Sequence, residues 1–159
     1  MKRVGFGPRL LALIIDAVII FIVVGIIGAL SGSGKNIDPQ EFSSIFSDPS
    51  RFMNPVQIII VLLYTSMEFL LAATPGKMIS KMKMKGASGI HAALPVLLTR
   101  WVIKQSANIL SFVFIITHIQ FIWVLQSLAG LVIFIGCFFA LGKNKQALHD
   151  RLAKTGVYK

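Results

Sequence analysis

The sequence predicts an all-α polytopic membrane protein with four transmembrane helices and a short cytoplasmic surface segment between the second and third helices. Hydrophobic residues make up 55% of the 159-residue chain and charged residues 14%, whereas soluble domains carry about 25% charged residues. The mean hydropathy is +0.79. Apolar residues form long blocks with the charge packed between them, which is typical of an integral membrane protein. The length allows one membrane domain, residues 1–159, and no separate soluble domain.

Four apolar blocks are predicted to form the helices. The first block has 21 residues, enough to cross a hydrocarbon core of ~30 Å at ~1.5 Å per residue. The second block ends before Pro75 and Gly76, which do not continue a helix. The third block spans a membrane only if it includes Arg100 and Lys104, and a tight turn at His118 precedes the fourth. The predicted helices are residues 10–30, 56–73, 97–117 and 121–141.

Basic residues in the short connections predict the orientation, because cytoplasmic loops of membrane proteins carry an excess of lysine and arginine. The loop at residues 31–54 has two basic and three acidic residues, whereas three, four and five basic residues precede the first helix, follow the second and follow the fourth. We therefore expect a multi-pass protein of the cell membrane with both termini cytoplasmic and loop 31–54 outside. A cleaved signal peptide is the alternative for the first block, but the block exceeds the usual length and contains Asp16.

Four lysines crowd the connection after the second helix. In the segment SKMKMK, lysine alternates with serine and methionine, and this period of two predicts a short extended segment with one wet face. Gly86 and Gly89 then permit a turn, so we expect a short hairpin on the cytoplasmic surface. Such lysines attract anionic lipids by ~1 kcal/mol each, although they could equally mark the orientation alone. The expected lipid-contact residues are Lys77, Lys81, Lys83 and Lys85.

Charged residues inside the apolar blocks are the unusual feature of this chain. A charge at the bilayer centre costs ~2.5–3.5 kcal/mol, so such residues usually face the bundle interior and have partners. Asp16 follows Arg9 by nearly two helical turns and shares its face. Glu68 lies near the cytoplasmic end of the second helix, and Arg100 and Lys104 enter the third from the same side. The sequence predicts one buried cluster with two acids facing three bases.

Two interpretations of this cluster remain open. It could only hold the helices together, since intramembrane polar contacts are worth ~0.6 kcal/mol on average while an unpaired buried charge is costly. It could also bind an ion or a proton, because burial favours a protonated carboxyl and a neighbouring cation favours an ionised one. That competition is what a proton-coupled exchanger needs. The surplus of bases also permits an anion site.

Other function classes find little support in the sequence. The net charge of +10 suggests nucleic acid, but the basic residues flank apolar blocks, so a membrane surface is the better partner. A single cysteine, Cys137, and three scattered histidines predict no metal site and no cofactor. No nucleophile–base arrangement indicates an enzyme. Gly25 with Ala29, and Gly136 with Ala140, allow close helix packing, and a four-helix transporter is expected to be a homo-oligomer.

Four segments, GPRLLALIIDAVII, TPGKMISKMKMKG, LLTRW and ALHDRLAKTGVY, resemble the RDD family of small prokaryotic membrane proteins in content and order. The family is named for one arginine and two aspartates. The arginine that opens its first helix matches Arg9, the aspartate within that helix matches Asp16, and the aspartate of a terminal HD motif matches Asp150. The resemblance covers nearly the whole chain except 31–54. It implies a prokaryotic plasma membrane and transport, including exchange of monovalent cations for protons.

The resemblance also draws attention to the predicted cytoplasmic tail, residues 142–159. Apolar residues of the tail could dock on the bundle and bring Asp150 to Arg9, Arg100 or Lys104. Alternatively, the tail is exposed and Asp150 pairs with a nearby lysine or caps its helix. The leading hypothesis is therefore a small transporter for monovalent cations and protons. The alternative is a non-catalytic accessory or scaffold subunit of a larger membrane complex.

Overall fold

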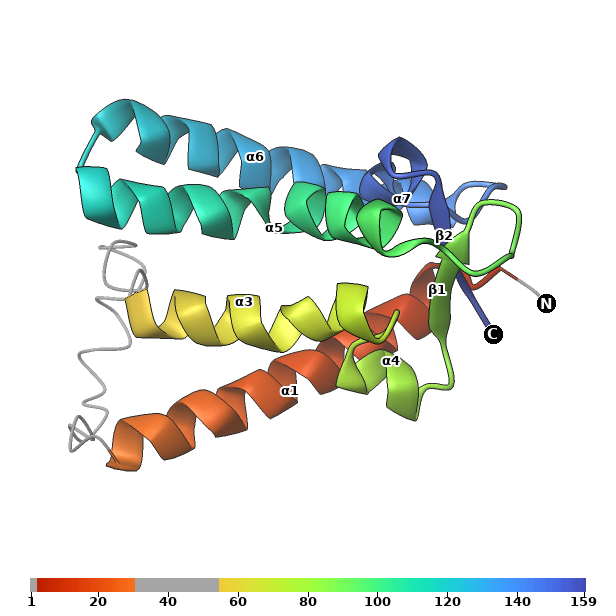
Figure 1. Ribbon diagram of the computed structural model, residues 1–159, viewed down its shortest axis with the longest axis horizontal. Coiled ribbons are helices and arrows are strands. Elements are labelled where there is room, and N and C mark those ends of the chain that lie inside the picture. The colour runs from red at the N-terminus through yellow and green to blue at the C-terminus, as the bar shows by residue number, and fades with distance from the viewer. Residues whose placement is uncertain (1–2, 31–54) are drawn as a thin grey trace.

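The computed structural model of the protein describes residues 3–30 and 55–159, and the predicted loop at 31–54 lies outside them (Figure 1). The described chain is mostly helical, which confirms the predicted class. Helix α5 packs against α6 on one side and α3 on the other, and α1 lies beyond α3. The long helices are α1 (Phe6–Leu30), α3 (Pro55–Leu70), α5 (Leu94–Thr117) and α6 (Gln120–Phe138).

Two segments of the described chain are long and apolar enough to cross a membrane, Phe6–Ile27 and Gln120–Leu141. Most side chains of both segments are exposed in the isolated chain, as expected of helices that face lipid. Helix α5 has 24 residues but carries two basic side chains in its first half, and α3 has 16 residues. Membrane crossing by α3 and α5 therefore stays a prediction.

Prolines set several helix boundaries. Pro8 lies in the first turn of α1 and Pro55 begins α3, positions where the missing N–H would have no intrahelical partner. Helix α3 ends at Leu70, three residues before the predicted boundary, and the chain turns at 71–74 into the short helix α4 (Pro75–Ile79). His118 adopts a left-handed conformation, φ 53°, after α5, which confirms the tight turn before α6.

The alternating lysine segment forms strand β1 (Lys83–Gly86), which confirms the predicted extended segment. Met82 and Met84 are buried while Lys83 is exposed. The predicted hairpin is wrong, because β1 pairs antiparallel with β2 (Thr155–Tyr158), with Lys83 opposite Tyr158. Alternation indicates which face of a strand is wet, but it does not specify the partner strand.

The short elements gather at one end of the bundle, where both described ends of the chain also lie (Figure 1). Helix α6 continues as the 3-10 turn η2 (Phe139–Leu141), followed by α7 (Leu148–Leu152). Gly76 allows α4 to touch α1, because a Cβ there would meet the carbonyl oxygen of Ala12. Gly136 likewise leaves space for Leu148 of α7. Buried apolar residues form a small core at this end of the bundle: Val4, Ala12, Ala72, Met82, Met84, Leu97 and Val157.

Candidate functional site

Glu68 lies at the end of α3 and is completely buried. Lys77 of α4 donates from Nζ to Oε1 at 2.5 Å, and Lys104 of α5 donates from Nζ to Oε2 at 2.9 Å. Arg100, also of α5, donates from Nη1 to Oε1. Three cations therefore surround one carboxylate, and such charge-assisted hydrogen bonds are stronger than neutral ones. The cluster fixes the end of α3 against α4 and α5.

Asp150 of α7 is the second fully buried acid. Arg100 donates from Nε to Oδ1 at 2.7 Å, and Arg9 of α1 donates from Nη1 to Oδ2 at 2.5 Å. Burial alone would raise the pKa of Asp150, but the guanidinium groups of Arg100 and Arg9 outweigh it and hold the pKa well below its ordinary value. Arg100 thus joins both acids, and we call Arg9, Glu68, Lys77, Arg100, Lys104 and Asp150 the ion-pair network.

Lys77 differs from the expectation that it contacts lipid headgroups. Its side chain is buried against Glu68, because the turn at 71–74 folds α4 back beneath the end of α3. Burial lowers the pKa of Lys77 to about 8, while Glu68 acts in the opposite direction. Lys77 is therefore a fourth base of the network, which the sequence placed with the surface lysines.

His149 is buried beside Arg100, with its Nε2 atom 3.3 Å from Nη2 of Arg100. Burial, reinforced by the charge of Arg100, lowers the pKa of His149 to about 3, so the ring is neutral at pH 7. Nε2 also lies 3.5 Å from Oδ1 of Asp150. The guanidinium is nearer and can only donate, which favours the tautomer in which Nε2 accepts and Nδ1 carries the ring proton. Among the described residues, Nδ1 of His149 finds no hydrogen-bond partner.

Asp16 lies apart from the ion-pair network. Its Oδ1 accepts hydrogen bonds from Tyr64 Oη and from the backbone N–H of Gly76, both at 2.7 Å. Its Oδ2 accepts one from Thr74 Oγ1 at 2.6 Å. The expectation that Asp16 faces Arg9 differs from this arrangement, because a shared helix face still separates them by ~10 Å along the axis. The carboxylate is instead held by uncharged donors.

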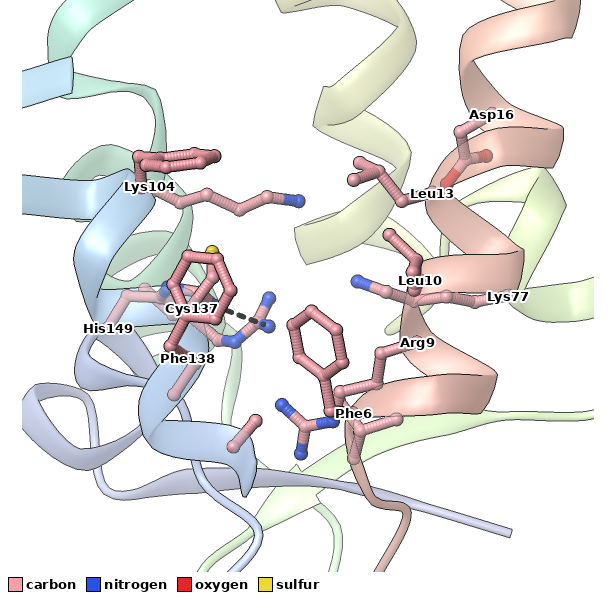
Figure 2. A pocket seen from close by; sticks show the side chains of 15 residues that line it. Phe6, Arg9, Leu10, Leu13, Asp16, Lys77, Lys104, Cys137, Phe138 and His149 are labelled. Carbon is pink, nitrogen blue, oxygen red and sulfur yellow. Dashed lines mark hydrogen bonds between the residues drawn. The ribbon is translucent and has the colours of Figure 1, made fainter. Parts of the chain in front are cut away.

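A cavity of about 470 Å³ lies between α1 and α6, beside the ion-pair network (Figure 2). Lys104 and Lys77 extend into it from opposite sides. Glu68 and Asp150 do not line it, so Asp16 is the only acid on its wall among the described residues. Four basic side chains line the cavity, namely Arg9, Lys77, Arg100 and Lys104, and its walls include Phe6, Leu10, Leu13, Phe134 and Phe138.

The remaining lysines of the alternating segment lie elsewhere. Lys81, Lys83 and Lys85 line a second hollow of about 530 Å³, together with His91 and Lys159. Their contact with anionic lipid headgroups stays a prediction.

Comparison with protein families supports the resemblance seen in the sequence. The family model described as RDD family matches residues 3–154, nearly the whole chain. The chain belongs to the RDD family. The two segments able to cross a membrane lie within that match, as expected for an RDD membrane protein. No curated protein and no solved structure shows a significant match.

Arg9, Asp16 and Asp150, which the resemblance matches to the arginine and the two aspartates of the family name, do not form one triad here. Arg9 binds Asp150, a contact between residues 141 positions apart. Asp16, in the same helix as Arg9, belongs to the separate group around Tyr64 and Thr74. The structure therefore brings together Arg9, Glu68, Arg100, Lys104 and Asp150 of the predicted site, and leaves Asp16 out.

Sequence reasoning missed Tyr64, Thr74 and His149 in this RDD protein. Tyr64 lies one helical turn before Glu68 in a largely apolar block. A hydroxyl at that position could have predicted a hydrogen bond to a polar side chain of a neighbouring helix. Thr74 directly precedes the proline that starts α4. No sequence pattern indicated that His149 is buried beside Arg100.

Proposed function

We propose that this RDD protein is a small transporter that exchanges monovalent cations for protons, with Asp16 as the residue that binds the ion. One observation carries the proposal. Asp16 is the only acid on the cavity wall among the described residues, and only uncharged groups donate hydrogen bonds to it. Glu68 and Asp150 are neutralised by basic side chains and stand behind the wall.

The atoms around Asp16 suit a hard cation, which prefers oxygen ligands. Its two carboxylate oxygens lie within 2.7 Å of the hydroxyl oxygens of Tyr64 and Thr74. A hydroxyl can donate or accept, so both can turn a lone pair toward a cation when one enters. A proton would occupy the same carboxylate. Proton and cation therefore compete for one site, which is the condition for exchange.

The helical structure is interrupted next to this site, between α3 and α4. Helix α3 stops at Leu70, and the turn at 71–74 and the first residues of α4 place Thr74 and Gly76 against Asp16. Ion sites of transporters are commonly built at discontinuous helices, where backbone groups reach the ion. The four basic side chains of the cavity oppose a bound cation, so we expect weak binding and rapid release.

The test is reconstitution into liposomes that carry a pH gradient. Addition of Na⁺, K⁺ or Li⁺ should collapse the gradient with the native chain and fail to do so with Asp16→Asn. Asp38→Asn, the same chemical change in the predicted outer loop, should exchange normally. Absence of a response to all three cations at several pH values would refute exchange. An active Asp16→Asn would refute the assignment of Asp16.

The ion-pair network favours a second candidate, an accessory or scaffold subunit of a larger membrane complex. Both buried acids are fully paired, and Arg100 ties α5 to α3 and α7, as a purely structural element would. On that hypothesis Asp16→Asn lowers stability or complex assembly, and the native chain shows no exchange in liposomes. Copurification from native membranes, compared between the native chain and Asp16→Asn, measures this.

We further propose that four helices cross the membrane and that the end carrying β1 and β2 is cytoplasmic. Support comes from the counts of basic residues and from the gathering of both described chain ends at that end (Figure 1). A cysteine placed at Ser43, in a chain with Cys137→Ala, should react with an impermeant thiol reagent added outside the cell. Labelling only after the membrane is opened would reverse the orientation.

A further inference from the structure

We infer that the cavity between α1 and α6 binds an anionic phospholipid, with the phosphate against the basic side chains and an acyl chain in the apolar opening. This inference does not rest on ion exchange. Three independent observations carry it: the charge of the cavity wall, an unsatisfied hydrogen-bond donor, and the position of the opening.

The cavity wall is positively charged. The ion-pair network holds four bases and two acids, and both acids are fully buried behind the bases. Asp16 is on the wall, but its oxygens already accept three hydrogen bonds. Each base contacts an acid, but four bases share two acids, so the network has a net positive charge that favours an anion. Lys104 has the most exposed side chain of the network, at 24%, which leaves it best placed to reach a ligand.

His149 supplies the unsatisfied donor. It lines the same cavity, and its Nδ1 carries the ring proton because Nε2 faces the Arg100 guanidinium. That N–H is buried and has no acceptor among the described residues. A buried N–H without an acceptor has lost its hydrogen bonds to water and gains none from the protein, which costs free energy. A phosphate offers oxygen atoms that accept hydrogen bonds from an imidazole N–H and from lysine or arginine alike.

The position of the opening selects a lipid over a free ion. Helices α1 and α6 contain the two segments best able to cross a membrane. They meet at the charged end, where Phe6 stacks on Phe138 with ring centroids 5.7 Å apart, and they separate toward the other end (Figure 1). The walls also include Leu10, Leu13 and Phe134, and Figure 2 shows Leu13 at the level of Lys104 and Leu10 close to Lys77. An opening between two such helices faces the hydrocarbon, where an acyl chain can enter.

The cavity wall thus combines basic side chains with apolar ones, which are the two kinds of contact that the headgroup and the acyl chain of an amphiphile need. Free inorganic phosphate would satisfy the bases but leave the apolar walls without a partner. A second copy of the chain would cover the walls but bring its own exposed apolar helices to the bases. The phospholipid is the occupant that meets both requirements.

The experiment compares lipid retention by native mass spectrometry of the full chain in detergent, after addition of phosphatidylglycerol or phosphatidylcholine. Phosphatidylglycerol should bind preferentially. Lys104→Gln should weaken that preference about tenfold, the order expected for one charge-assisted hydrogen bond. Glu68 keeps two cations in this variant, so the fold should persist. Lys143→Gln, an exposed lysine outside the cavity, is the matched control.

A second variant tests the apolar half without touching a charge. Leu13→Trp places an indole in the opening and should reduce phosphatidylglycerol binding. Leu11→Trp is the matched control and should not, because Leu11 is 56% exposed, close to the 58% of Leu13, but does not line the cavity. Equal phosphatidylglycerol retention by the native chain, Lys104→Gln and Leu13→Trp would overturn the inference.

Two further outcomes would also overturn it. Displacement of phosphatidylglycerol by millimolar inorganic phosphate would identify a site for the free anion. A native dimer that Leu13→Trp converts to a monomer, with lipid binding unchanged, would identify the opening as a subunit interface. Loss of exchange in liposomes would bear on the proposed function alone, because lipid retention is measured without any ion gradient.

Discussion

Replacing Arg100 by methionine removes the one side chain that contacts both buried acids. Its guanidinium donates to Glu68 and Asp150 and reaches Nε2 of His149. Methionine keeps an unbranched apolar stem but ends before the position of the guanidinium carbon, so the change removes the atoms that reach both acids. What is lost is a buried charge with its hydrogen bonds.

The remaining partners set the size of the effect. Without Arg100, Glu68 still contacts Lys77 and Lys104, and Asp150 still contacts Arg9. Because each acid keeps at least one basic partner, the loss in the free energy of unfolding should lie at the lower end of the ~3–5 kcal/mol typical of a broken buried ion pair. We expect about 3 kcal/mol. For a chain of this size that corresponds to a fall in Tm of roughly 6–12 °C.

Circular dichroism of the purified chain in detergent, followed during heating, measures the change. Arg100→Lys should lose about half as much, because an ammonium is a compact charge that reaches one acid and not both. In a double-mutant cycle with Asp150→Asn, the two losses should be non-additive by about 1–3 kcal/mol. A loss below about 1 kcal/mol for Arg100→Met, or strict additivity, would refute the idea that Arg100 joins α3 to α7.

Three other changes probe neighbouring contacts. Acid should destabilise the fold. Burial lowers the pKa of His149 to about 3, whereas a histidine in the unfolded chain has a pKa of ~6.5. The free energy of unfolding should therefore fall by ~1.4 kcal/mol for each pH unit between these two values as the pH drops. His149→Gln should flatten that slope in unfolding midpoints at pH 7 and 5. Gly76→Ala should cost about 1–3 kcal/mol in Tm measurements because its Cβ meets Ala12, whereas Gly25→Ala should be tolerated. Tyr64→Phe should cost about 1 kcal/mol, and unchanged denaturation would exclude its bond to Asp16.

The long helices of this fold were readable because each follows from the length of an apolar block, and α1, α3 and α5 also have a proline in the first turn. The pairing of charges was not readable to the same degree. Depth along the helix axes correctly grouped Glu68 with Arg100 and Lys104. Depth says nothing about direction around each axis, however, and Arg9 turns to Asp150 while Asp16 turns to Thr74.

Lys77 shows why the remaining features escaped the sequence. Along the chain it looks like the other lysines of the alternating segment. Only the turn at 71–74, which folds α4 under the end of α3, buries its ammonium against Glu68. Similarly, the partner of β1 is the distant strand β2, a pairing that depends on where the tail lands and not on the local pattern.

The contact between Arg9 and Asp150 has a consequence for the order of assembly. Arg9 belongs to the first long helix to be synthesised, whereas its acid partner follows the last long helix. Until α7 and β2 have been synthesised, Arg9 and Arg100 lack their ion pairs with Asp150, and β1 lacks the strand with which it pairs. Completion of the tail is then the step that neutralises the charges and closes the sheet together. A chain that lacks α7 and β2 keeps both defects, so we expect it to be cut by an added protease faster than the full chain.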